Sequence, residues 1–488
     1  MSAGSAPARA DVAVIGAGWA GLAAAIHLVQ AGRKVRLIDA APQTGGRARR
    51  IKLDWEHPVQ GPGPVELDNG QHLLIGAYTE VLALLDLIGA LGDDRLIRRP
   101  MRLASSSGLL MQRPSLGNDR ADGPLGSLAA ALFKPLSPLL ALVNADGLSV
   151  ASRWAMVRTL AGLRLARWRA PAGVATVSDW YLHSRQPAEL IERVWRPLVI
   201  SALNTPPGSA CATTFLMVLR DSLGGPPEAS DFILPRRDLS DLFVDPAVDW
   251  LQVHGAEIML RSDVRRIERG NALRYRIVGS TRQVDHPVAF ECEQVVLATP
   301  PYATARLLQG LADETLVSEL NRFEYLPITT AYLGWATLQP QAEGDGASLA
   351  LPPLLSLRDA PESRRFAQWF FDRGLNAHWR IAALVLSDSR AARELGDARL
   401  AEALIGQVVE ELGLPAPLRL SLIHEKRATI ACTPGRPRLA PDAAMKQLPG
   451  IALAGDFTYL DYPATLEGAA RSGRQAAEVV LGERRSRV

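Results

Sequence analysis

The chain has 488 residues, of which 48% are hydrophobic and 22% are charged, so it can hold two or three domains with substantial cores. A formal net charge of +3 gives no broad basic surface, which argues against a nucleic-acid-binding protein. Met1–Ala10 is not expected to be a signal peptide, and no uninterrupted apolar run reaches the ~18–20 residues of a membrane span. Three widely spaced cysteines favour neither a disulfide framework nor a metal site, and they fit a reducing cytosol: Cys211, Cys292 and Cys432.

The first predicted unit is a strand, a helix and a second strand. Asp11–Ile15 is a short apolar run rich in β-branched residues, which is typical of a buried parallel strand. A helix is expected over Leu22–Ala31, ended by Gly32, and the second strand over Val35–Ile38. This order is that of a dinucleotide-binding βαβ unit.

The turn within this unit has the glycine spacing that a pyrophosphate requires. Gly16 permits the tight turn, Gly18 lets the backbone approach the pyrophosphate, and Gly21 lets the helix pack close to the strand. The helix N-terminus adds unpaired N–H groups and a partial positive charge. Asp39, at the tip of the second strand, is placed to accept hydrogen bonds from ribose hydroxyls. The segment therefore predicts a bound dinucleotide rather than an empty βαβ unit.

A second glycine pair follows this unit in the run Gly45-Gly46-Arg47, with Arg49 and Arg50 close behind. The run resembles the Gly-Gly-Arg segment of the flavin amine oxidase and phytoene desaturase superfamily. There the glycines pass beside the flavin and the arginine reaches toward its phosphates. The resemblance implies FAD as the cofactor, with Gly46 and Arg47 in contact with it. From the residues alone, a solvated basic loop is the alternative.

The next motif is the stretch DNGQHLLIGAY at residues 68–78, before a helix expected over Thr79–Gly89. In the superfamily a Gly-Gly or Gly-Gln pair at this point runs past the flavin ring, so Gly70 and Gln71 are implied as cofactor contacts. The resemblance also implies an active-site role for His72. A hydrogen-bonded loop histidine near a helix start is the alternative.

Residues 125–170 have the composition of a membrane-contact region. Leu125–Val150 is apolar but interrupted by prolines and charges, and Ala151–Ala170 has five arginines, no acid and two tryptophans among leucines. Such a mixture suits a membrane interface, where aromatic rings lie at headgroup depth and arginines meet anionic lipid. The alternative is a helix of a second domain whose arginines pair with acids elsewhere.

Later segments are expected to return the chain to the cofactor. The resemblance implies that the backbone of Val264 contacts the adenine, and that residues 295–300 form the turn between cofactor and substrate domains. Between them and the C-terminus, four strands of a mixed sheet are expected: Tyr325–Leu338, Leu349–Leu357, Phe366–Asp372 and Ile381–Ser387.

The C-terminal part resembles the second FAD signature of the superfamily, with a strand ending in Gly455-Asp456 and a small-residue helix over Thr465–Leu481. The resemblance implies that Asp456 bonds the ribityl or pyrophosphate region. It also implies that N–H groups near Leu466 and Glu467 face the flavin pyrimidine oxygens.

Two runs are the most specific: residues 68–78, and YPATLEGA at residues 462–469. Over about residues 11–482 the chain resembles the hydroxysqualene dehydroxylases of bacterial hopanoid biosynthesis, also called squalene-associated FAD-dependent desaturases. The resemblance implies reductive removal of an allylic hydroxyl from hydroxysqualene to give squalene, with hydride delivered from reduced flavin N5 after acid-assisted loss of water. It further implies a long apolar tunnel and upstream hydroxysqualene-forming synthases.

The proton donor is left open among His72, Asp461 and Tyr462, which all lie near the expected flavin face. Glu467 is expected to act as a helix N-terminal charge instead. Three other functions are open alternatives: a carotenoid-type desaturase, an amine oxidase with a polar aromatic cage, and a cofactor-free scaffold of a lipid-synthesis complex. The expected location is cytoplasmic, with peripheral contact at the inner face of the cytoplasmic membrane, and no metal site is expected.

The expected fold class is α/β, with a Rossmann-like FAD-binding domain of the GR2 type and an inserted α+β substrate domain. The FAD-binding domain is expected over residues 10–105, 250–315 and 425–485. The substrate domain is expected over residues 106–249 and 316–424. Its first part should be helical, and its second part should carry the mixed sheet.

Overall fold

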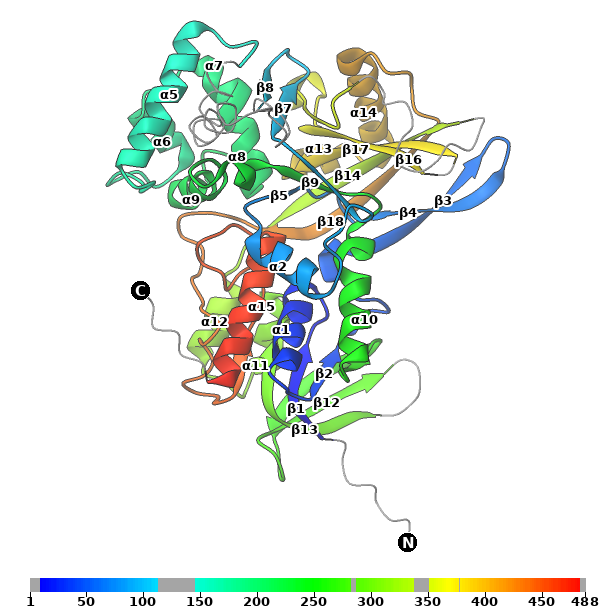
Figure 1. The fold of residues 1–488 in the computed structure, drawn as a ribbon, viewed down its shortest axis with the longest axis vertical. Coiled ribbons are helices and arrows are strands. Elements are labelled where there is room, and N and C mark those ends of the chain that lie inside the picture. The colour runs from blue at the N-terminus through cyan, green and yellow to red at the C-terminus, as the bar shows by residue number, and fades with distance from the viewer. Residues whose placement is uncertain (1–8, 113–144, 282–286, 338–350, 377, 483–488) are drawn as a thin grey trace, which may run out of the picture.

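The computed structural model describes residues 9–112, 145–281, 287–337, 351–376 and 378–482. The molecule is elongated, with two halves stacked along its long axis, and each half is built around one seven-stranded sheet (Figure 1). The described residues confirm the expected α/β fold class.

The sheet of the lower half in Figure 1 has the order β10-β2-β1-β13-β12-β11, and β19 also pairs with β13. The pairs among β1, β2, β10, β13 and β19 are parallel, whereas β11 and β12 pair antiparallel. The strands are β1 (Arg9–Ile15), β2 (Val35–Ile38), β10 (Glu257–Met259), β11 (Ser262–Arg269), β12 (Tyr275–Thr281), β13 (Pro287–Leu297) and β19 (Ile451–Leu453).

Helices cover both faces of this sheet, which explains why its central strands are apolar without alternation. Val12 and Val14 of β1 pack in the cluster with α1 (Trp19–Gln30), α2 (Thr79–Leu87), α10 (Asp245–Val253) and α15 (Leu466–Leu481). Ala13 and Ile15 point the other way, toward α11 (Pro301–Leu308) and α12 (Glu314–Asn321). Helices α1 and α15 pack so closely that a side chain at Gly473 would collide with the carbonyl oxygen of Ala20.

The sheet of the upper half has the order β18-β14-β17-β16-β15-β7-β8. All its pairs are antiparallel except β15 with β7. Of the expected strand Leu349–Leu357, residues 349–350 lie outside the described residues. The strand begins at Leu354, because Pro352 and Pro353 lack backbone donors just before it. The strands are β7 (Arg102–Ser105), β8 (Leu110–Gln112), β14 (Tyr325–Ala336), β15 (Leu354–Ser356), β16 (Trp369–Asn376), β17 (Trp379–Ser387) and β18 (Arg419–Ile430).

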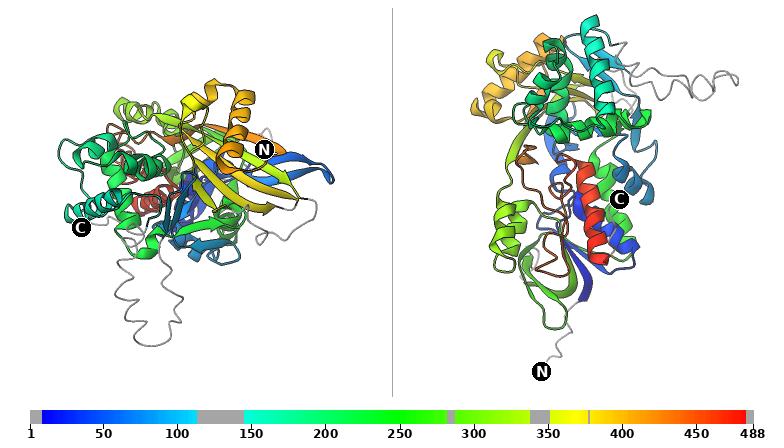
Figure 2. Two further views of the ribbon diagram at one scale, coloured as in Figure 1. Left: turned by 90° about the horizontal axis from the view of Figure 1, so that it is seen from above. Right: turned by 90° about the vertical axis from the view of Figure 1, so that its left-hand side faces the viewer.

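Two groups of helices pack against this second sheet. On one face lie α13 (Arg390–Glu394) and α14 (Asp397–Leu412). On the other face the chain forms a helical group whose core contains Trp180, with its ring against those of Trp195 and Phe215. Figure 2 shows this group at the upper end of the molecule, to one side of the second sheet. Its members are α5 (Val150–Leu165), α6 (Val177–His183), α7 (Ala188–Leu190), η3 (Ile191–Trp195), α8 (Arg196–Leu203) and α9 (Ala212–Leu223).

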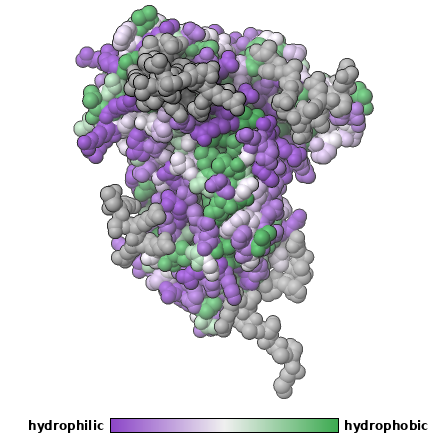
Figure 3. Space-filling view, viewed as in Figure 1, coloured by the Kyte–Doolittle hydropathy of each residue, from purple (hydrophilic) through white to green (hydrophobic). Residues whose placement is uncertain are grey.

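Short elements join the halves. Strand β3 (Arg50–His57) pairs with β4 (Gly61–Asp68), and β9 (Phe232–Pro235) pairs with both β5 (Leu74–Ile75) and β6 (Leu96–Arg99). Apolar side chains gather at the middle of the face seen in Figure 3, near the level where the halves meet. The remaining short turns are η1 (Gly46–Ala48), η4 (Pro227–Ser230), η5 (Ser240–Val244) and η6 (Pro361–Ser363).

Candidate active site

The first glycine turn leaves no room for side chains at two of its three glycines. Gly16 has φ +106°, and a Cβ there would lie 2.5 Å from the carbonyl oxygen of Ala298. A Cβ on Gly21 would collide with the carbonyl oxygen of Gly16. Both glycines are therefore required by the packing of α1 against β1 and β13.

Gly18 differs from these two, because its space is open to a ligand. It is the N-cap of α1, and among the described residues no side chain caps this helix and no acid lies in its first turn. The second glycine pair packs against it, with a backbone bridge between Gly18 and Gly45. A Cβ on Gly46 would lie 3.0 Å from the Cα of Gly18. Bare backbone and unpaired N–H groups thus meet at one point, which fits a pyrophosphate.

Asp39 lies at the carboxyl end of β2, beside this point. Its Oδ2 accepts a hydrogen bond from the Ala17 N–H at 2.7 Å, and its Oδ1 accepts one from the Ala41 N–H at 2.8 Å. Burial raises the pKa of Asp39, although both hydrogen bonds act in the opposite direction. The Ser262 N–H donates to the Asp39 carbonyl oxygen, so β11 and its buried Val264 lie alongside the same end of the sheet.

Arg47 and Asp456 join the two cofactor signatures directly, although they are 409 residues apart. The Nη2 of Arg47 lies 2.5 Å from Oδ2 of Asp456, and its Nη1 donates to the Ala428 carbonyl oxygen at 2.9 Å. Burial alone would lower the pKa of Arg47, but the Asp456 charge raises it above its ordinary value. Gly455, with φ +150°, donates its N–H to Ser472 Oγ and turns the chain at this point.

Gly70, Gln71 and His72 line a cavity between the two halves. The Nδ1 of His72 lies 2.7 Å from the Gly70 carbonyl oxygen, and burial lowers the pKa of His72. A carbonyl can only accept, so the neutral ring carries its proton on Nδ1 and leaves Nε2 as an acceptor. The Oε1 of Gln71 is buried with no hydrogen-bond partner among the described residues.

Tyr462 and Asp461 are neighbours in sequence with different surroundings. Tyr462 is buried, lines the cavity and donates its hydroxyl hydrogen to Asp221. Burial raises the pKa of the Tyr462 hydroxyl, and the hydrogen bond to Asp221 adds to this. Arg220 holds Asp221 through two hydrogen bonds of 2.6 and 3.1 Å. Asp461 is exposed and is not part of the cavity wall. The structure thus brings His72 and Tyr462, but not Asp461, to the same cavity.

Leu466 begins α15 and lines the cavity together with its N-cap Thr465. The next residue, Glu467, turns away and is fully buried. Its carboxylate accepts hydrogen bonds of 3.0 Å from the N–H groups of Glu80 and Val81, and it lies 2.6 Å from Arg471. Glu467 is therefore a helix N-terminal charge, but it caps α2 rather than its own helix.

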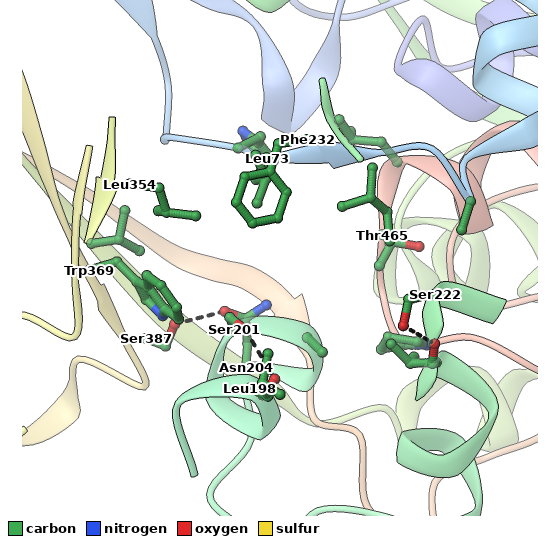
Figure 4. A pocket seen from close by; sticks show the side chains of 18 of the residues that line it. Leu73, Leu198, Ser201, Asn204, Ser222, Phe232, Leu354, Trp369, Ser387 and Thr465 are labelled. Atoms are coloured by element: carbon green, nitrogen blue, oxygen red, sulfur yellow. Dashed lines mark hydrogen bonds between the residues drawn. The ribbon is translucent and has the colours of Figure 1, made fainter. Parts of the chain in front are cut away.

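The cavity itself has a volume of about 350 Å³ and mostly apolar walls (Figure 4). Leu73, Phe232, Leu354 and Trp369 point into it from the sheet side, and α8 and α9 form the opposite wall. Ser387 Oγ and Asn204 Oδ1 form a 2.8 Å hydrogen bond across one end. Its charged lining residues are Arg47, Asp221 and Glu425.

Sequence reasoning missed Asn69, Asp221 and Glu425 as cavity residues. Asn69 adjoins a motif and could have been included with it. Asp221 lies in an ordinary amphipathic helix and Glu425 in a strand where polar and apolar residues mix, so neither carries a local signal. Only the packing of α9 and β18 brings them to the cavity.

Other site chemistries find little support in the described residues. Within them, no group of three or more His, Cys, Asp or Glu side chains is arranged to hold a metal ion. The three cysteines are free. No helix in the described part of the chain is both long and apolar enough to cross a membrane.

The residues present fit FAD. Gly18 and Gly46 could leave bare backbone for its pyrophosphate, Asp39 could offer a carboxylate to a ribose, and the N-terminus of α15 faces the cavity where the ring would lie. When bound, this cofactor supplies hydride transfer.

Comparisons with known proteins agree with this geometry. Residues 19–481 match the family described as flavin containing amine oxidoreductase. The chain is 28% identical over 480 residues to hydroxysqualene dehydroxylase of Rhodopseudomonas palustris, covering 97% of this chain and 99% of that protein. It is 24% identical to hydroxysqualene dehydroxylase of Zymomonas mobilis, covering 96% and 98% of the two chains. It is also 24% identical to zeta-carotene desaturase of Synechocystis, covering 96% and 97%.

Solved structures share the fold at lower identity. Putrescine oxidase bound to putrescine has a TM-score of 0.63 at 17% identity, covering 97% of this chain and 99% of that one. An oxidoreductase from Methanosarcina mazei has a TM-score of 0.66 at 16% identity, covering 96% and 100%. The chain belongs to the flavin-containing amine oxidoreductase family, and it is an FAD-dependent oxidoreductase.

Proposed function

We propose that the protein converts hydroxysqualene to squalene by reductive removal of the allylic hydroxyl. The observation that carries this proposal is the cavity, whose walls are mostly apolar and whose polar groups lie beside the cofactor-binding segments. Such walls suit a long isoprenoid chain and exclude water from the reacting carbon. The hydroxysqualene dehydroxylases among the relatives span nearly the full chain, which supports the same reaction.

The proposed cofactor contacts come from four segments of the chain. The first glycine turn and Asp39 would hold the adenosine and pyrophosphate end, and Arg47 with Asp456 would lie between that end and the cavity. The full set is Gly16, Gly18, Gly21, Asp39, Gly46, Arg47, Gly70, Gln71, Val264, Gly455, Asp456 and Leu466.

Two of the proposed catalytic residues line the cavity. His72 offers Nε2 as an acceptor to a substrate hydroxyl, since its Nδ1 proton is held by Gly70. Tyr462 fixes Asp221 at the wall formed by α9. Asp461 would need a rearrangement of its loop to reach a ligand, because it is exposed outside the cavity.

A product assay tests the reaction. Purified protein with reduced FAD and hydroxysqualene is expected to form squalene, and with oxidised FAD and phytoene it is expected to form no desaturated product. The opposite pattern would favour carotene desaturation, which the zeta-carotene desaturase relative keeps as the second candidate. Amine-dependent release of peroxide would contradict both.

We also propose that α5 contacts an anionic membrane surface, at the inner face of the cytoplasmic membrane, where an upstream hydroxysqualene-forming synthase would release its product. Trp154 and Leu165 are 69% and 87% exposed and lie eleven residues apart on one side of α5. Arg158 and Arg164 are exposed on the same helix. Residues 125–144 of the expected contact region lie outside the described residues. Co-sedimentation with phosphatidylglycerol vesicles should fall in Trp154→Ala, and equal binding to neutral vesicles would contradict this.

A further inference from the structure

Glu425 is a cavity carboxylate that is neither a proposed cofactor contact nor one of the catalytic residues proposed so far. It lies on β18 opposite Ile328 of β14, and both residues line the cavity. The side chain is half-buried. A reaction that removes a hydroxyl group needs an acid within reach of the substrate oxygen. The acidic groups near the cavity differ in whether they are free to reach that oxygen.

The position of Glu425 is beside the segment expected to pass the flavin ring. Asn69, which directly precedes Gly70, donates through Nδ2 to the Arg47 carbonyl oxygen at 3.0 Å and to Glu425 Oε2 at 3.4 Å. Arg47 also attracts the Glu425 charge, but its guanidinium is held by Asp456 and the Ala428 carbonyl. In the described part of the chain, Glu425 therefore has one long hydrogen bond and no ion pair within 4 Å.

The other acid candidates are already engaged. Asp221 accepts hydrogen bonds from Arg220 and from the Tyr462 hydroxyl, so neither Asp221 nor Tyr462 directs a proton at a ligand. The N–H of neutral His72 is donated to Gly70. Asp461 is outside the cavity. Glu425 alone among these groups both lines the cavity and has a carboxyl that no ion pair or short hydrogen bond of the described residues holds.

We propose that Glu425 is the general acid for the departing hydroxyl, an assignment that rests on the proposed dehydroxylation. The Glu425 carboxyl gives its proton to the hydroxyl oxygen, and the carbon–oxygen bond breaks with its electron pair on oxygen, so that water leaves. The allylic cation would take a hydride from the reduced FAD that the cofactor segments would hold, which would leave FAD oxidised. Glu425, left as a carboxylate, regains a proton from solvent.

A change of leaving group tests this role. The acetate ester of hydroxysqualene departs as acetate and needs no proton, whereas the alcohol does. Glu425→Gln should keep its FAD content and flavin spectrum, lose at least about 100-fold in the rate of squalene formation from the alcohol, and keep the wild-type rate on the ester. Glu410→Gln, the same change at a side chain that is 68% exposed on α14, should leave both rates unchanged.

The other possible outcomes contradict either the assignment of Glu425 or the proposed function. An equal loss on alcohol and ester in Glu425→Gln, or no loss on the alcohol, would overturn the assignment. If the wild-type protein rejects the ester, Glu425→Asp decides: it should recover part of the alcohol rate, and a loss as deep as in Glu425→Gln would overturn the assignment. A wild-type protein that forms no squalene from the alcohol would instead overturn the proposed function.

Discussion

Gly18→Ala should separate cofactor binding from folding. Gly18 has φ −76° and ψ −179°, an extended backbone that alanine adopts without strain. The nearest atom to an added methyl group is the Cα of Gly46 at 3.8 Å, which is an ordinary contact. The expected loss of apoprotein stability is therefore only about 0.5–1 kcal/mol, from placing alanine at a helix N-cap.

Binding of FAD should suffer much more, because the same methyl group would occupy the space where the pyrophosphate approaches the N-terminus of α1. We expect Kd to rise at least about 100-fold, which corresponds to ~2.8 kcal/mol. Urea unfolding of the apoprotein measures the first effect, and titration of the refolded apoprotein with FAD, followed by flavin fluorescence, measures the second.

Gly21→Ala is the matched control, since it adds the same methyl group three residues away. There the methyl would collide with the Gly16 carbonyl oxygen, so the turn itself must move and the apoprotein should be strongly destabilised. The reasoning is refuted if Gly18→Ala binds FAD with wild-type affinity, or if its apoprotein is as unstable as that of Gly21→Ala.

Three further substitutions test other parts of the argument. Glu467→Ala should lower the free energy of unfolding by ~3–5 kcal/mol, because it leaves Arg471 without its buried counter-ion and uncaps α2; urea unfolding that matches wild type would contradict this. Burial raises the pKa of Asp68 from its usual 3.8 to about 6, so its protonation stabilises the fold below pH ~4 and that contribution, about 3 kcal/mol, is lost as pH rises through 6. Asp68→Asn should weaken the pH dependence of the free energy of unfolding between pH ~4 and ~6. An unchanged slope of that free energy against pH would contradict the prediction. His72→Ala should keep FAD, by its visible spectrum, yet slow squalene formation, and an unchanged rate would remove His72 from the proposed mechanism.

The cofactor end of the molecule could be predicted because its physics is local. Gly21 is dictated by a collision with the Gly16 carbonyl oxygen five residues away, and Gly16 by its own φ of +106°. The strand order around β1 follows from the βαβ unit, and the FAD assignment from two signatures that each occupy one short segment. Where the residues that form a turn or a binding motif lie in one short segment, the pattern of residue types predicts it.

The meeting of distant segments could not be predicted in the same way. Glu467 looks in sequence like the first-turn acid of its own helix, and the structure gives its charge to α2. Asp461 and Tyr462 are adjacent, yet one faces solvent and the other the cavity. The direction of a single loop side chain depends on which element packs over it, and for Tyr462 that element is α9.

The cofactor segments are local in sequence, whereas the charged residues of the cavity come from distant segments. This difference helps to explain how one fold can serve different reactions. The fold is shared with a solved putrescine oxidase at 17% identity. The charged groups that distinguish the cavity, Asp221 and Glu425, come from α9 and β18, which carry no motif. A change of residue at either position would alter the chemistry available to a ligand without touching the cofactor segments. Reaction type within this fold should therefore be read from the charges on the cavity walls, and the glycine signatures identify only the cofactor.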